Sequence, residues 1–386
     1  MHRVLVHMLS GLGFPEVDSR HDGAETLAEF TAGLEHPDLV FLDLNMPRMD
    51  GIEFLRGLAE QNFAGSVVLV SAEGERVLQM TEKLVHAHRM TVLGHLRKPV
   101  SLSALSAIVQ KWQPTSVAEQ QPEAYGPDEL RAAMERGELE NYYQPKVAIA
   151  NAGLVGFETL VRWRHPADGV IAPDRFVPMA EEYGLIAELT RGVLTRAFEQ
   201  SATWRKAGLA LGVAVNVSMD NLADPGFADE VLGLAATMGA APRDIMLELT
   251  ESRLMLDQRQ ALEALARLRI KRFRLAIDDF GTGHSSLLQL RDIAFDELKI
   301  DQAFVHGAWR DATTRAICEA SLGLGRQLGI EVVAEGVRDR DDWNFVARSG
   351  CDLAQGHFIG AAMPANRLQD WMEAWERRAP LLRAGL

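Results

Sequence analysis

Short apolar runs of strand length recur throughout residues 127–386, and stretches with helical spacing separate them. The eight runs that we interpret as strands are ENYYQPKVAI, LVGFETLVRW, LGVAVNVS, DIMLELT, FRLAIDDFG, FDELKID, IEVVAEGV and DLAQGHFIG. The polar residues toward their ends lie about 20 to 60 positions apart, and a strand-helix-strand unit takes about 30 residues. Eight strands with intervening helices in about 250 residues predict a TIM-like (β/α)8 barrel.

Several of these runs end in an acid, an amide or an amine. The set comprises Gln144, Glu158, Asn216, Glu248, Asp278, Lys299, Glu335 and Gln355. Because the C-terminal ends of barrel strands converge on one face, we expect these distant residues to form a single cluster. A lone carboxylate at a strand end is more often a helix cap or a surface group, so the prediction depends on the repetition.

The predicted cluster is acidic, and crowded carboxylates raise one another's pKa unless positive charge offsets them. Lys299 and Arg162 are the only basic residues that the sequence pattern is expected to place near this cluster. They are too few to offset the acids, so the natural counter-ions are metals. Oxygen ligands without His or Cys favour Mg²⁺ or Mn²⁺ over zinc. The adjacent acids Asp278 and Asp279 predict two ions, because one carboxylate can bridge them while its neighbour binds the second. Two metal ions are a recurrent arrangement in phosphodiester hydrolysis.

The motifs of this part of the chain resemble those of the EAL domain family, the cyclic di-GMP phosphodiesterase module. In the family's order they are YYQPKV, GFETLVRW, NVS, LELTES, IDDFGTGHSS, LKID, VVAEGV and AQG, over roughly residues 127–375. The resemblance implies hydrolysis of cyclic di-GMP to the linear dinucleotide pGpG, with two divalent ions as cofactors.

The resemblance also implies roles for individual residues. The implied metal ligands are Glu158, Asn216, Glu248 and Asp278, with Asp279 toward the second ion. Lys299 would orient or activate the attacking water, and Glu335 would act as general base or as a ligand of the second ion.

Further residues are implied to contact the substrate or to support a loop. Gln144, Arg162 and Gln355 would contact the dinucleotide, and the Arg162 guanidinium offers a fork that matches phosphate. The segment GTGHSS resembles the family loop that couples metal binding to dimerisation, and Glu251 resembles the glutamate that holds it. A homodimer through this domain is therefore expected.

The chain departs from the family pattern at several places. The signature is ETL rather than EAL, His284 replaces an aromatic residue, Arg338 stands where a glutamate is common, and GHFIGAAMP differs from the usual end of the last strand. None of these removes a predicted metal ligand, so an active enzyme is expected. The alternative is a catalytically weak domain that senses cyclic di-GMP or scaffolds a partner. A phosphotransfer adaptor alone would leave the carboxylates without a role.

Residues 1–112 show a similar alternation, with the apolar runs DLVFLDL and SVVLVSA and the helical pattern GIEFLRGLAE between them. This predicts a parallel sheet covered by helices in a doubly wound domain. The run LVFLDLNMPRMDG resembles a response-regulator receiver domain. The resemblance implies Asp43 as phosphoacceptor, Ser71 and Lys98 as ligands of the phosphoryl oxygens, and a sensor histidine kinase as partner.

The opening MHRVLVHMLSGLGF has the spacing of an amphipathic helix and corresponds to the first helix of a receiver. The family's first strand and its acidic pair are therefore expected to be missing. His95 stands in the place of the usual switch aromatic. Our hypothesis is that phosphorylation of Asp43 modulates the phosphodiesterase through domain packing or a dimer interface.

Residues 113–126, QPTSVAEQQPEAYG, predict a linker between domains at 1–112 and 127–386. The formal charge of −14 argues against a long nucleic acid as partner. Cys318 and Cys351 lie outside any C-x-x-C pair, which argues against a disulfide framework or a zinc site and favours the reduced cytoplasm. No apolar run reaches 18 residues, so membrane insertion is not expected.

Overall fold

The computed structural model describes residues 2–14, 16–31, 37–46, 48–61, 63, 65–72, 78, 80–81, 84–85, 90–112, 125–250, 258–282 and 290–383. The chain forms two compact units, Met1–Glu123 and Ala124–Leu386. The division falls inside the predicted linker, most of which lies outside the described residues, so the domain boundaries stay a prediction. Within the described ranges, no helix combines the length and apolar character that crossing a membrane requires.

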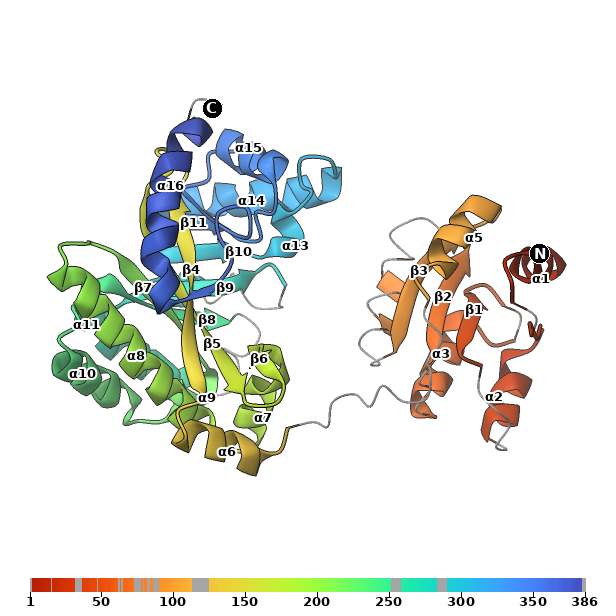
Figure 1. Ribbon diagram of the computed structural model, residues 1–386, viewed down its shortest axis with the longest axis horizontal. Helices are drawn as coiled ribbons and strands as arrows, with labels where there is room; N and C mark the ends of the chain where they lie inside the picture. Colours follow the sequence, from red (N-terminus) through yellow and green to blue (C-terminus); the bar gives the residue numbers. More distant parts are fainter. Residues whose placement is uncertain are drawn as a thin grey trace. The chain divides into compact units, whose positions relative to one another are not determined.

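In its described part, the first unit is built on a parallel sheet in the order β1–β2–β3 (Figure 1). Its elements are α1 (His2–Gly11), α2 (Gly23–Thr31), β1 (Leu39–Asp43), α3 (Gly51–Glu60), β2 (Ser66–Ser71), β3 (Thr91–Arg97) and α5 (Leu102–Val109). Val67 and Leu69 of β2 pack in one apolar cluster with α2 and α3, whereas Val68 and Val70 pack in another with α1 and α5. Helices on both faces of the sheet confirm the doubly wound prediction.

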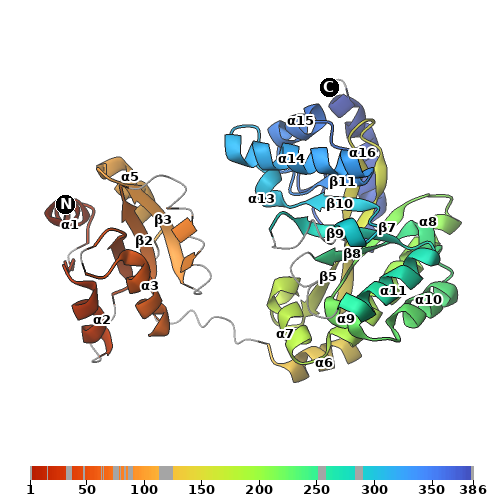
Figure 2. The ribbon, with the colours of Figure 1, turned by 180° about the vertical axis from the view of Figure 1, so that it is seen from behind.

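The second unit is a closed barrel, seen from two sides in Figures 1 and 2. Around the barrel the strand order is β4–β12–β11–β10–β9–β8–β7–β5, and β5 pairs with β4 to close it. The strands are β4 (Leu139–Ala148), β5 (Leu154–His165), β7 (Gly212–Val217), β8 (Ile245–Thr250), β9 (Arg274–Phe280), β10 (Glu297–Ile300), β11 (Glu331–Ala334) and β12 (Leu353–Gln355). Each coincides with one of the eight predicted runs, although β4 begins one residue before its run and β5 ends two residues after its run, and this confirms the TIM-like barrel.

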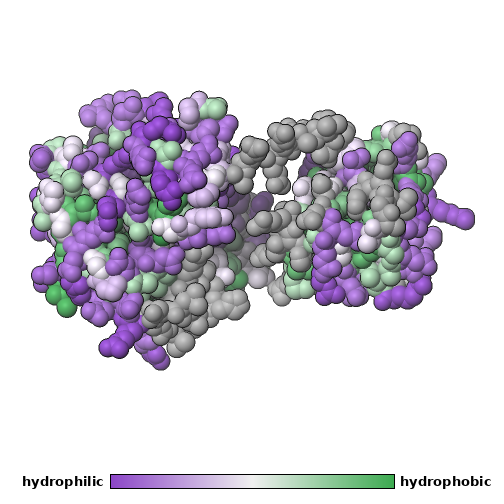
Figure 3. All heavy atoms as spheres, turned by 90° about the horizontal axis from the view of Figure 1, so that it is seen from below, coloured by the Kyte–Doolittle hydropathy of each residue, from purple (hydrophilic) through white to green (hydrophobic). Residues whose placement is uncertain are grey.

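Helices surround this barrel and separate most of its strands. They are α6 (Pro127–Glu135), α7 (Val177–Glu182), α8 (Ile186–Lys206), α9 (Met219–Ala223), α10 (Phe227–Met238), α11 (Gln258–Ile270), α13 (Gln302–Val305), α14 (Ala312–Leu328), α15 (Arg340–Arg348) and α16 (Leu368–Arg383). Short elements complete the unit: β6 (Gly169–Ile171), β13 (Met363–Pro364), η1 (Pro173–Arg175), η2 (Pro242–Asp244) and η4 (Ala365–Arg367). The face in Figure 3 is largely hydrophilic, as expected for helices whose apolar sides face inward.

The first barrel strand departs from the expected alternation of strand and helix. β4 and β5 form an antiparallel hairpin without a helix between them, and β4 also runs antiparallel to β12. The prediction that Gln144 and Glu158 end their strands is therefore wrong, because they lie opposite each other in mid-strand. Two adjacent apolar runs have the same pattern whether they pair in parallel or antiparallel, so the sequence did not reveal this direction.

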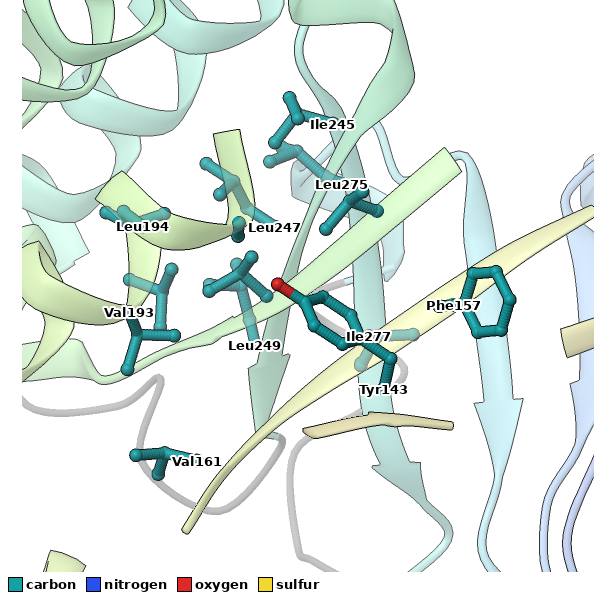
Figure 4. Close-up of a cluster of buried hydrophobic side chains, with 14 of the residues drawn as sticks. Tyr143, Phe157, Val161, Val193, Leu194, Ile245, Leu247, Leu249, Leu275 and Ile277 are labelled. Carbon is teal, nitrogen blue, oxygen red and sulfur yellow. The ribbon is translucent and has the colours of Figure 1, made fainter. Parts of the chain in front are cut away.

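Side chains alternate between the two sides of the barrel wall. On the outer side, residues of β8 and β9 gather in one buried apolar cluster with α8 (Figure 4). They are Ile245, Leu247, Leu249, Leu275 and Ile277, together with Val193 and Leu194 of α8. On the inner side, Ala214, Met246 and Ala276 form a small separate cluster. The next inward positions of the same strands are Asn216, Glu248 and Asp278, so the alternation itself directs these polar groups into the barrel.

Gly156 marks the closest approach of β5 to β7. A Cβ atom at this position would lie 2.3 Å from the carbonyl oxygen of Gly212. We expect Gly156→Ala to lower the free energy of unfolding by about 1–3 kcal/mol, because neither backbone can move without breaking the strand pairing. Urea unfolding of the full chain, followed by tryptophan fluorescence, measures this.

The matched control is Gly192→Ala in α8, where a Cβ atom would meet nothing within 4 Å. This exposed helical position should leave stability unchanged or raise it by up to about 1 kcal/mol. Equal losses in the two variants would contradict the role of Gly156.

Candidate functional site

Lys299 lies at the centre of a buried acidic cluster inside the barrel. Its Nζ is 3.4 Å from Glu158 Oε2 and 3.0 Å from Glu248 Oε2. The same atom is 3.1 Å from Asp278 Oδ1 and 2.8 Å from Glu335 Oε1. These five residues belong to β10, β5, β8 and β9 and to the end of β11. Closure of the barrel thus brings together groups that lie far apart in the sequence.

Two amide side chains donate hydrogen bonds to Glu158 of this cluster. Asn216 Nδ2 donates to Glu158 Oε1 at 2.9 Å, and Gln355 Nε2 donates to Glu158 Oε2 at 2.5 Å. Gln355 Nε2 also donates to Gln144 Oε1 at 3.0 Å. Both oxygens of Glu158 therefore accept hydrogen bonds, which fixes the orientation of the carboxylate. The eight predicted residues form one connected network.

The charges within the cluster do not balance. Burial alone would lower the pKa of Lys299, but the carboxylates around it raise that pKa well above its usual value, so the group is an ammonium. Burial raises the pKa of Glu248 and of Glu335 well above the usual value, and Lys299 offsets only part of this effect. Burial also opposes ionisation of Glu158, but Lys299 and the two amide donors outweigh it and lower the pKa. One ammonium does not compensate four buried carboxyl groups, so their ionised forms need further cations.

Asp279 enters the cluster through a local break in strand geometry. Its φ is 55°, a left-handed conformation that is uncommon outside glycine. Between the register pairs Leu298–Ile277 and Ile300–Phe280, β9 contains one residue more than β10. This β-bulge allows Asp278 and Asp279 both to face the site instead of alternating. Burial, followed by the neighbouring acids Asp278 and Asp301, raises the pKa of Asp279 to about 6.

The donor set fits hard divalent cations. Two groups of three carboxylates have ligand atoms within 4.8 Å of one another, and they share Asp278. They are Glu158 with Glu248 and Asp278, and Asp279 with Glu335 and Asp278. Glu248 Oε1 is buried and has no hydrogen-bond partner among the described residues. Carboxylate oxygens, an amide oxygen and an unpaired buried acceptor are ligands that suit Mg²⁺ or Mn²⁺.

The sequence analysis missed a second buried ion pair in the barrel. Lys146 Nζ lies 2.5 Å from Glu297 Oε1, with side chains only 7% and 1% exposed. Lys146 follows Gln144 by two positions and Glu297 precedes Lys299 by two, so each pair shares one side of its strand. The signal was present as charged residues inside the apolar runs. The positive charge of Lys146 acts to lower the pKa of both Glu158 and Glu248.

Three predicted features lie apart from the network or outside the described residues. Arg162 is half-buried, donates from a guanidinium nitrogen to Val161 O at 2.9 Å, and lies 5.8 Å from the ring centre of Tyr142. Among the described residues it forms no hydrogen bond or ion pair with the acidic side chains of the cluster. Glu251 lies outside the described residues, as does the GTGHSS loop from Gly283 onward with His284.

The first unit brings its predicted residues together at one end of the sheet. Lys98 Nζ lies 2.5 Å from Asp43 Oδ2, and the Lys98 backbone N–H donates to Ser71 O at 2.9 Å. Asp43 ends β1, Ser71 ends the adjacent β2, and Lys98 directly follows β3. The parallel strands therefore place a carboxylate, a buried hydroxyl and an ammonium at the same end of the sheet.

Comparison with known proteins agrees with both units. A family model described as EAL domain matches residues 128–362, and one described as response regulator receiver domain matches residues 1–110. The cyclic di-GMP phosphodiesterase RocR of Pseudomonas aeruginosa is 32% identical over 358 residues, which cover 91% of this chain and 90% of that protein. The bifunctional diguanylate cyclase/cyclic di-GMP phosphodiesterase MucR of the same organism is 40% identical over 241 residues, which cover 62% of this chain and 35% of that protein.

Solved structures agree with the barrel. The MucR phosphodiesterase in complex with c-di-GMP has a TM-score of 0.60 and 40% identity, and the match covers 62% of this chain and 98% of that chain. The EAL domain of DcpA from Mycobacterium smegmatis has a TM-score of 0.53 and 28% identity, covering 62% of this chain and 97% of that chain. The chain therefore belongs to the EAL domain family, and its EAL domain follows a response regulator receiver domain.

Proposed function

We propose that this protein hydrolyses cyclic di-GMP to linear pGpG at the mouth of the barrel, with two Mg²⁺ or Mn²⁺ ions as cofactors. The observation that carries the proposal is the presence of two sets of three carboxylates, which have Asp278 in common. The relatives RocR and MucR, which are named as cyclic di-GMP phosphodiesterases, support the choice of substrate. A mononuclear site would leave one of the two groups without a role.

The residues divide between the two ions according to these groups. Glu158, Asn216, Glu248 and Asp278 would hold the first ion, and Asp278, Asp279 and Glu335 the second. Two divalent cations supply the charge that polarises a phosphodiester and makes water easier to deprotonate. Lys299 contacts carboxylates of both groups and, as an ammonium, keeps them close together before any ion binds.

Glu335 is the acid best placed to accept a proton from the attacking water. It is the first residue after β11, and its side chain is 17% exposed, whereas that of Glu248 is 0% exposed. A general base must reach both water and the substrate, which a fully enclosed carboxylate cannot do. Lys299 Nζ donates to it at 2.8 Å and would orient the carboxylate.

Gln144, Gln355 and Arg162 would contact the dinucleotide. Gln355 Oε1 is buried without a hydrogen-bond partner among the described residues, so it can accept from a base or a ribose hydroxyl. Arg162 would contribute a bidentate fork to phosphate.

The receiver domain would regulate this activity. Asp43, with Lys98 Nζ at 2.5 Å and Ser71 at the end of the adjacent strand, has the groups that stabilise an aspartyl phosphate. A sensor histidine kinase would supply the phosphoryl group. Dimerisation through the EAL domain, and Glu251 as support of the loop involved, stay predictions.

The first of three predictions from the proposed function concerns the general base. Glu335→Ala should reduce kcat by about 10²–10⁴-fold, because proton abstraction from water loses its acceptor. Chromatography of pGpG formed from cyclic di-GMP in the presence of Mg²⁺ or Mn²⁺ measures this. Glu158→Ala should abolish turnover as well.

Glu331→Ala is the matched control, because Glu331 begins the same strand, β11, and pairs with Arg274 at 2.7 Å on the protein surface. It should keep kcat within about threefold of the wild type. Full turnover in both Glu335→Ala and Glu158→Ala would refute the assigned roles. A wild type that binds cyclic di-GMP without hydrolysing it would instead support the sensor alternative.

The second prediction concerns metal binding without turnover. Metal-free protein should gain about 2.7 kcal/mol of stability when Mg²⁺ or Mn²⁺ is present at 100 times its dissociation constant. Thermal unfolding with and without the ion measures this. Asp278→Asn should lose the gain because the shared ligand is weakened, whereas Asp128→Asn on the exposed face of α6 should keep it. An unfolding temperature of the wild type that neither ion changes would exclude a metal site.

The third prediction concerns the receiver domain. Radiolabelled acetyl phosphate should label the wild type but not Asp43→Asn, because Asp43 lies beside Lys98 at the end of β1. The control Asp38→Asn, one residue before β1, should be labelled like the wild type. Absence of label from the wild type as well would mean that the receiver acts as a docking element.

A further inference from the structure

Arg338 lies in the segment between β11 and α15, three residues after Glu335. Backbone hydrogen bonds attach this segment to β10 and to β12. Glu335 N donates to Ile300 O at 3.1 Å, and Val337 N donates to Gln355 O at 3.0 Å. The position of the Arg338 backbone relative to the acidic cluster is thus set by β10 and β12, although its side chain is exposed.

The guanidinium of Arg338 contacts α13, the helix that follows β10. One of its terminal nitrogens donates to Gln302 Oε1 at 2.9 Å. Gln302 begins α13, which directly follows β10, and a Cβ atom on Gly336 would lie 2.2 Å from Gln302 Cβ. Gln302 is therefore packed against the residue next to Glu335, and it links the guanidinium to α13, three residues after Lys299.

Arg338 keeps most of its donors available. A guanidinium has five N–H donors, and the bond to Gln302 uses one of them. Among the described residues no carboxylate forms an ion pair with Arg338, whereas Arg274, for example, pairs with Glu331 at 2.7 Å. The charge of Lys299 is already shared among buried carboxylates. Arg338 is thus an exposed cation beside the site in a chain of net charge −14.

We propose that Arg338 binds the second phosphodiester of the cyclic dinucleotide, the one that is not cleaved. This inference rests on the proposed function. A cyclic dinucleotide carries two phosphates, and the acidic cluster with its cations takes only the scissile one. The planar fork of a guanidinium matches two phosphate oxygens, and Gln302 orients that fork before the substrate arrives. Arg338 would then increase affinity for the substrate without taking part in bond cleavage.

The experiment compares two variants that remove the same hydrogen bond. Arg338→Ala loses both the bond and the cation, whereas Gln302→Ala loses the bond and keeps the cation. We expect Arg338→Ala to raise KM for cyclic di-GMP about tenfold with kcat within about twofold of the wild type. Gln302→Ala should raise KM by less than about threefold, and Arg338→Lys should lie between, because an ammonium is a point charge.

Ionic strength provides a readout that loss of loop packing would not change. Raising salt from about 0.05 M to about 0.5 M should raise KM of the wild type more than KM of Arg338→Ala, because the variant has lost the screened attraction. Calorimetric titration with cyclic di-GMP should show the same tenfold difference in Kd between wild type and Arg338→Ala.

Two results would overturn the inference while the proposed function stands. One is an unchanged KM in Arg338→Ala, and the other is an equal rise of KM in Arg338→Ala and Gln302→Ala, which would mean that the residue only supports the loop. A wild type that neither binds nor hydrolyses cyclic di-GMP would overturn the proposed function and this inference together.

Discussion

The ion pairs between Lys299 and the carboxylates around it are the interaction on which the site depends. Charged groups removed from water cost several kcal/mol each unless partners compensate them. Here the compensation is incomplete, because one ammonium faces Glu158, Glu248, Asp278 and Glu335. Divalent cations would therefore favour the ionised forms of these acids, and Lys299 prevents the acids from moving apart in their absence.

The barrel can accommodate this charge because the residues that stabilise the fold and the residues that form the site lie on opposite sides of its wall. Residues that point outward, such as Leu247 and Ile277, pack against the surrounding helices in the large apolar cluster. Residues that point inward from the same strands form the acidic cluster, with Ala214, Met246 and Ala276 as a small apolar group nearby. Burial of the outer apolar surface supplies the free energy of folding, and the inner positions are left available for function.

Regular strand geometry alone would not produce the site. Alternation would send Asp279 outward, but the bulge against β10 and its φ of 55° turn the chain so that both acids face inward. A left-handed conformation at a residue other than glycine costs on the order of 1 kcal/mol or more. The result is a second group of carboxylates next to the first, with Asp278 common to both. The bulge thus supplies the carboxylates of the second ion in the proposed site.

The sequence by itself determined the eight strands and the polar residues that meet in the barrel, because alternation and spacing are local properties of the chain. The receiver pair Asp43 and Lys98 followed from the resemblance of the first domain to receiver domains. Only the tertiary structure decided that β4 runs antiparallel, that Lys146 pairs with Glu297, and that Gln302 holds Arg338. Strand direction and contacts between distant side chains follow from closure of the barrel. Closure depends on all strands at once, so no single motif contains that information.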